Sequence, residues 1–186
     1  MTDTANSPTA PRDPLLLAAR LFLWFLIGTL SLACVFVTLG LPVVAVMQSQ
    51  IMAELTSEGM ASGKEVIGAM LALLASAAVF LGLAVYFLVL LLRIVNSVKQ
   101  GDPFIADNAQ RLAWMGWVAV AAQVAIIPLA AMALWLDEAI GDQPGTTFET
   151  DVSINPTGIL LVLILFILAR VFRRGAEMRD ELEGTV

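Results

Sequence analysis

Four long apolar runs alternate with polar segments along the chain, at residues 15–47, 66–92, 113–136 and 159–172. A hydrocarbon core about 30 Å thick is crossed by about 20 helical residues, so the first three runs are long enough. The fourth is shorter, but the long stem of Arg170 extends its reach by snorkelling. Since lipid leaves backbone groups no outside partner, all four runs are predicted to be membrane-spanning helices.

The polar segments predict the rest of the organisation. Residues 1–14 contain three prolines and few apolar side chains, which is typical of a disordered tail. Residues 48–65 are predicted to be helical or irregular. Residues 142–145 read Asp-Gln-Pro-Gly, a turn signal, and alternation over 148–154 predicts a short strand within 146–154. The sequence does not indicate which segment would pair with that strand.

Composition supports the membrane class and narrows the chemistry. Hydrophobic residues make up 59% of the chain and charged residues 14%, against about 25% charged in soluble domains. There is no histidine, and the one cysteine, Cys34, lies in an apolar run, where a buried thiol is expected. We therefore expect no metal or other cofactor and no enzymatic activity.

The distribution of cations predicts the orientation. Nine of the ten lysine and arginine residues lie on the N-terminal side, in the middle loop or on the C-terminal side, and Lys64 is the exception. Cytoplasmic loops carry the excess of lysine and arginine, so both termini and the middle segment are predicted to be cytoplasmic.

The predicted fold is therefore all-α: a polytopic membrane protein with four transmembrane helices in an antiparallel bundle, both termini inside. Residues 1–14 form a cytoplasmic tail, 15–175 the transmembrane domain and 176–186 a second cytoplasmic tail.

The middle segment, between the second and third runs, has the features of an elbow between two helices. Gly101 is placed to end one helix, and Asp102 and Pro103 are placed as N-cap and first residue of the next. Apolar residues from Phe104 to Leu112 fall near one face, so this stretch is predicted to lie on the membrane surface before the third span. The elbow serves as a rigid corner or also as a docking surface for a cytoplasmic partner.

Two motifs resemble a bacterial domain-of-unknown-function family of small four-helix membrane proteins (DUF2975-like). The first comprises Gly101-Asp102-Pro103-Phe104, Asn108-Ala109 and Arg111-Leu112; the second comprises 168–175 and 181–186. The resemblance is detailed in the second half of the chain and limited to hydropathy in the first. It implies a gene that often lies beside one for a small helix-turn-helix regulator, and hence a protein of the bacterial inner membrane that binds such a partner.

The C-terminal segment carries two further hypotheses. Arginines at the end of the fourth run and at the end of the second are predicted to meet anionic lipid headgroups: Arg93, Arg170, Arg173 and Arg174. The chain end is predicted to be a short ligand for a cytoplasmic protein, acting with the elbow. The predicted partner-binding residues are Asp102, Phe104, Asn108, Arg111, Glu181, Glu183 and Val186.

Apart from the arginines near the ends of the runs, polar groups inside the runs are few and neutral. Gln123 lies in the middle of the third run, and a hydrogen bond to a neighbouring helix is its expected role. Two functions remain: a membrane-embedded regulator or scaffold for a small helix-turn-helix protein, or an oligomeric small transporter or channel subunit. Homo-oligomerisation is left open, and direct nucleic-acid binding is not expected because the cations line a lipid boundary.

Overall fold

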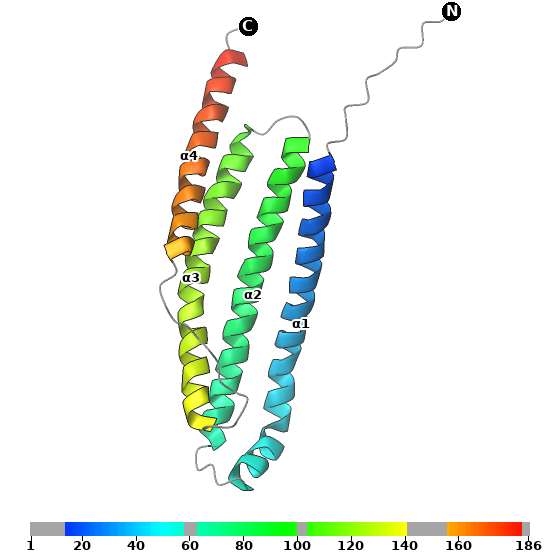
Figure 1. The fold of residues 1–186 in the computed structure, drawn as a ribbon, viewed down its shortest axis with the longest axis vertical. Coiled ribbons are helices and arrows are strands. Elements are labelled where there is room, and N and C mark those ends of the chain that lie inside the picture. Colours follow the sequence, from blue (N-terminus) through cyan, green and yellow to red (C-terminus); the bar gives the residue numbers. More distant parts are fainter. Residues whose placement is uncertain (1–13, 58–62, 100–103, 141–155, 184–186) are drawn as a thin grey trace, which may run out of the picture.

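The computed structural model describes residues 14–57, 63–99, 104–140 and 156–183, and these ranges contain four α-helices and no strand (Figure 1). The helices are α1 (Pro14–Ser57), α2 (Gly63–Lys99), α3 (Ala106–Ile140) and α4 (Pro156–Glu183). Each is long and apolar enough to cross a membrane, as predicted. The strand expected within 146–154 lies outside the described residues, as do residues 1–13 of the predicted tail at 1–14; Pro14 is the first residue of α1.

The helices are longer than the apolar runs that predict them. The polar segment between the first two apolar runs, residues 48–65, is helical where it is described, because α1 extends to Ser57 and α2 starts at Gly63. α3 continues through Pro128 and α1 through Pro42. α4 runs without a break through Gly175, so the predicted division between transmembrane domain and C-terminal tail falls inside one helix.

The helices run up and down side by side in chain order (Figure 1). Among the described residues, α1 packs on α2, α2 on α3 and α3 on α4, and no other pair of helices is in contact. Their antiparallel order is as predicted. The bundle is an open row in which each helix touches only its neighbours in sequence.

Three apolar clusters hold the row together. The largest joins α2, α3 and α4 around Leu90, Met115 and Leu165. A second joins α1 to α2 through Leu23, Ile27 and Leu92, and a third lies near the start of α2, where Met132 of α3 packs on Val66 and Ala69. Many large apolar side chains outside these clusters are exposed, as expected where lipid is the solvent.

The fourth helix is displaced along its neighbour. Gly158, in the first turn of α4, lies against Gln123 in the middle of α3. Phe172 lies against Phe104, just before α3 begins. α4 therefore starts at the depth where α3 is half crossed, and its C-terminal end extends past the corner between α2 and α3 (Figure 1).

Candidate functional site

The corner between α2 and α3 differs from the predicted elbow. Helix α3 begins at Ala106, not at Pro103, and Asp102 lies outside the described residues. The carbonyl of Ile105 closes the first turn by accepting from the backbone N–H of Asn108 at 3.0 Å and of Ala109 at 3.4 Å. The amphipathic stretch thus forms the first turns of a continuous spanning helix and is not a separate surface helix.

A buried polar network fastens this corner. Asn108 is 0% exposed, and its Nδ2 donates to Ser97 Oγ of α2 at 2.6 Å. The Ser97 hydroxyl donates in turn to the carbonyl of Ile94 at 2.7 Å. Arg111 Nη1 donates to Asn108 Oδ1 at 2.9 Å, so both ends of the Asn108 amide are satisfied. Asn108 therefore contributes to the predicted docking surface only by holding α3 on α2.

The outer layer of the network is an ion pair. Arg111 Nη2 lies 3.5 Å from Asp107 Oδ2, one turn earlier on α3, and the Asp107 side chain is largely exposed. An exposed pair of this kind stabilises a helix by about 0.3–0.5 kcal/mol. Arg111 thus links the buried amide to the surface, and its own side chain is partly buried.

Phe104 connects the corner to α4. Its ring centroid lies 5.1 Å from that of Phe172, and a Cβ at Gly175 would stand 2.9 Å from its Cδ1. Phe104 is nevertheless 45% exposed, so one side of the ring packs on α4 while the other faces outward. The two motifs that carry the family resemblance, far apart in sequence, meet in this contact.

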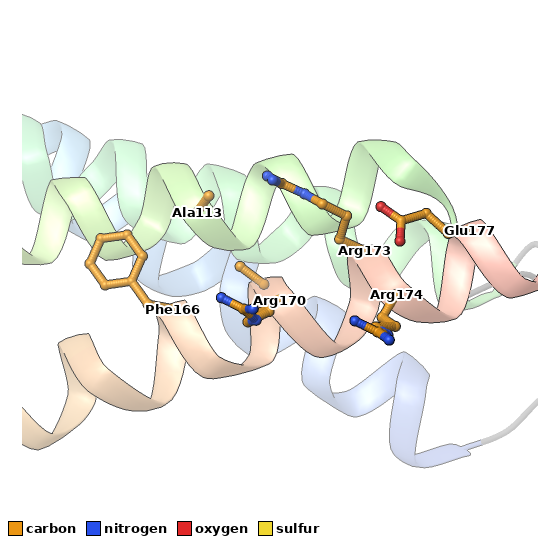
Figure 2. A pocket seen from close by; sticks show the side chains of 7 residues that line it. Ala113, Phe166, Arg170, Arg173, Arg174 and Glu177 are labelled. Carbon is orange, nitrogen blue, oxygen red and sulfur yellow. The ribbon is translucent and has the colours of Figure 1, made fainter.

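A pocket of about 470 Å³ lies beside this contact, between α3 and α4. Figure 2 shows Arg170, and about one turn further along α4 the adjacent Arg173 and Arg174, with Phe166 at one end of the pocket and Glu177 at the other. No described residue forms a hydrogen bond or ion pair with any of these guanidinium groups. The pocket lining comprises Ala113, Phe166, Ala169, Arg170, Arg173, Arg174 and Glu177.

The predicted residues are thus only partly brought together. Phe104, Arg111 and the arginines of α4 gather at one end of the row, whereas Arg93 lies on α2 and does not line the arginine pocket. Glu181 is exposed near the end of α4. The Glu183 side chain and Val186 lie outside what the structure describes.

Three contributors were missed by sequence reasoning: Ser97, Phe172 and Gly175. The available signal was a small residue next to the arginines, since a helical glycine often marks close approach of another group. The pairing of Ser97 with Asn108 has no comparable signal, because a serine near a helix end has many possible partners. Across the described chain, no three His, Cys, Asp or Glu side chains are grouped so as to hold a metal ion.

Four apolar helices with their arginines gathered at one end define a multi-pass membrane protein. A family model described as "protein of unknown function (DUF2975)" matches residues 8–186, nearly the whole chain, and the protein belongs to this family. No curated protein and no solved structure matches the chain significantly.

Proposed function

We propose that the protein is a docking protein of the bacterial inner membrane that captures and releases a small cytoplasmic helix-turn-helix regulator. The contact of Phe104 with Phe172 and Gly175 carries this proposal, because it holds the predicted elbow against α4, the helix whose end leads into the other predicted part of the docking surface. The helix-turn-helix identity of the partner rests on the family resemblance. No catalytic step is part of the proposal.

Exposed apolar side chains on the projecting end of α4 support the docking role. Met178 is 56% and Leu182 71% exposed, one helical turn apart and both beyond Arg174. Lipid covers exposed apolar groups within the spans, but these two lie past the level of the headgroups that the arginines would meet. Exposed apolar pairs at a spacing of four residues are the anchors of helix-in-groove recognition. A groove on the partner would cover them.

The orientation in this proposal follows from the arginines. Leu23 and Leu92 pack together, which brings Arg20 of α1 and Arg93 of α2 to the same end of the row. Arg111 lies at that end too, because it bonds to Asn108, which bonds to Ser97 of α2; Arg170 follows, because Phe172 packs on Phe104. Positive residues stay on the cytoplasmic side. Single cysteines at Lys99 and Arg174 in a Cys34→Ser background should both be labelled only from the cytoplasm; labelling from opposite faces would overturn the orientation.

The docking test uses the tagged full-length protein in native membranes. Replacing Met178 and Leu182 together by serine should reduce capture of the cytoplasmic partner at least about tenfold, since each buried side chain is worth about 1.5–3 kcal/mol. Asp180→Ser, on the opposite face of the same helix, is the matched control and should leave capture unchanged. Deleting residues 181–186 should abolish capture and leave membrane insertion intact. Equal capture by all variants, or no helix-turn-helix protein among the captured proteins, would contradict the proposal.

A second function is favoured by the arginine pocket. We infer that Arg170, Arg173 and Arg174 bind the phosphate of an anionic lipid, because their guanidinium groups have no partner in the described chain and follow the apolar stretch of α4, where a headgroup would meet them. Each such cation contributes about 1 kcal/mol with anionic headgroups. Phosphatidylglycerol should be retained over phosphatidylcholine in native mass spectra. Arg173→Gln should lower retention about fivefold, whereas Arg93→Gln should not; equal retention of both lipids, or the same effect from both variants, would exclude a lipid site at the arginine pocket.

The transporter or channel alternative has less support. Ionisable groups at membrane depth are the usual mark of ion-coupled transport. Among the described residues, those between the arginine level and Trp135 of α3 include no Asp, Glu, Lys, Arg or His.

A further inference from the structure

A second cavity lies in the middle of the row, away from the arginine pocket. It is a lateral groove of about 480 Å³ to which all four helices contribute, although α1 and α4 do not touch each other. Its lining is apolar apart from one side chain, Gln123. The lining residues are Leu26, Leu30, Phe80, Leu83, Ala84, Phe87, Leu88, Val118, Ala119, Ala122, Gln123, Ile126, Gly158 and Leu161.

Gln123 does not form the interhelical hydrogen bond expected of it. Its side chain crosses from α3 to α4, where the amide fills the space that a Cβ at Gly158 would occupy. Its Nε2 is buried, and it is the one buried side-chain nitrogen or oxygen without a hydrogen-bond partner in the described chain. Because Gly158 has no side chain, the Gln123 amide fits beside α4 in the groove. No other side chain lining the groove can form a hydrogen bond with that amide.

The depth of this amide makes water a poor partner. Gly158 and Arg170 are about 12 residues apart on α4, a rise of about 18 Å. With Arg170 at the boundary of a hydrocarbon core about 30 Å thick, the amide lies about 12 Å from the opposite boundary. Phospholipid ester groups stay at the boundaries and do not reach it. A free amide at this depth is costly, because lipid offers no acceptor.

We propose that the groove binds a small, uncharged, mainly apolar molecule that carries a carbonyl oxygen, and that the Gln123 amide donates to this oxygen. A half-turn about the last torsion of Gln123 exchanges its oxygen and nitrogen, which turns the N–H donors away from Gly158 and toward the groove. The lining holds no charged residue, so a carboxylate or ammonium group would be buried without compensation.

The size and shape of the groove fit this class of ligand. Its volume lies within the range of about 300–1,000 Å³ that holds drug-sized molecules. Phe80 and Phe87 of α2 contribute aromatic surface to the lining, and Leu26 of α1 and Leu161 of α4 contribute aliphatic surface. A plain acyl chain would satisfy the apolar lining and leave the amide unpaired, so the carbonyl is the feature that distinguishes the ligand from bulk lipid. This inference does not depend on the docking function.

The test uses 4-alkylbenzophenone as probe, an apolar diaryl ketone that photocrosslinks at its own carbonyl. The full-length protein in lipid nanodiscs is illuminated with increasing probe, and the crosslinked residues are mapped by mass spectrometry. Saturable labelling of α2 and α3 residues in the groove is expected. A benzophenone competitor should suppress it, and diphenylmethane, which has the same rings without the carbonyl, should compete about 5–10-fold less well because it cannot accept the hydrogen bond.

Two variants separate the groove from nonspecific partitioning. Gln123→Leu keeps the volume and removes the donor, so half-saturation should require about 5–10-fold more probe. Ala122→Phe fills the groove and should abolish the labelling, whereas Ala121→Phe, on the exposed side of the same turn, should not. Thermal unfolding reported by Cys34 checks that every variant is folded.

Several outcomes would overturn the proposal. These are labelling that rises without saturation, equal competition by diphenylmethane, or equal labelling of wild type, Gln123→Leu and Ala122→Phe. Absence of groove labelling together with a dimeric mass in the nanodisc would instead assign the groove to a second copy of the chain. Absence of labelling in a monomer would leave the groove to lipid chains or to residues 141–155, and either result rejects the ketone ligand.

Discussion

Two carboxamides on α3, Asn108 and Gln123, lie about 22 Å apart along the helix and occupy opposite environments. Asn108 is fully buried, donates to Ser97 and accepts from Arg111. Gln123 lines an open groove, and its Nε2 has no partner. Buried polar groups in proteins are almost always paired, and exceptions gather at functional sites. The comparison separates a corner whose buried amide is fully paired from a groove in the middle of the row whose amide nitrogen has no partner in the described chain.

The largest effect should come from removing the satisfied amide. Asn108→Leu leaves the Ser97 and Arg111 groups without their partner in a fully packed corner, so it should lower the free energy of unfolding by about 2–3 kcal/mol. Gln110→Leu, on the exposed side of the same helix, should change it by less than about 0.5 kcal/mol. Denaturant titration in mixed micelles measures both values. Equal values for the two variants would mean that the network does not fasten the corner.

The unsatisfied amide should respond with the opposite sign. Gln123→Leu removes an unpaired buried donor and keeps a similar volume, so it should raise the free energy of unfolding by about 1 kcal/mol in the ligand-free protein. The half-buried thiol of Cys34, on α1 with its Sγ 3.7 Å from the Ala78 carbonyl of α2, provides the readout through its reaction with a fluorogenic maleimide. A destabilised variant would show that Gln123 has a structural partner after all.

A smaller effect should appear as coupling at the arginine-rich end. Gly175→Ala gains helix propensity worth about 1 kcal/mol, but its Cβ meets the Phe104 ring at 2.9 Å. The substitution should therefore stabilise a Phe104→Ala protein and give little or no gain in the wild type. A double-mutant cycle measures the difference, expected at about 0.5–1 kcal/mol. Additive effects would show that Phe104 does not pack on α4 in the membrane.

The smallest change should follow loss of the exposed ion pair. Asp107→Ala removes the carboxylate 3.5 Å from Arg111 and leaves the hydrogen bond between Arg111 and Asn108 in place. A loss of at most about 0.5 kcal/mol is expected, and it should shrink further at high salt. The same titration at low and high salt measures it. A loss comparable with that of Asn108→Leu would make Asp107 part of the buried network.

Hydropathy was sufficient to predict the four helices and their antiparallel order. In lipid, each apolar run must pair its own backbone groups as a helix, and successive runs must cross the membrane in opposite directions. Helix pairing was not predictable: an open row and a closed bundle need the same apolar runs. The start of α3 was misjudged because Asp102 and Pro103 have the types that begin helices, whereas Ile105 closes the first turn through its backbone carbonyl. A backbone acceptor carries no residue-type signal.

For the candidate sites too, some residues were predictable from the sequence and their neighbours were not. Residue type alone identified the arginines of α4 and singled out Gln123, since charge and polarity are conspicuous in an apolar helix. Their neighbours were beyond reach, because the displacement of α4 along α3 decides that Gly158 meets Gln123 and that Gly175 meets Phe104. The displacement of α4 along α3 depends on many small packing contacts, and no single residue in the sequence predicts it.

The open row has a consequence for how the protein is made. Because each described helix touches only the one before and after it, every contact between helices is available as soon as the later partner leaves the ribosome. α1 and α2 can pair before α3 is synthesised, and α4 joins last without rearranging them. Biogenesis can therefore proceed as successive additions at one edge, with the projecting end of α4 completed only after the other three helices are assembled.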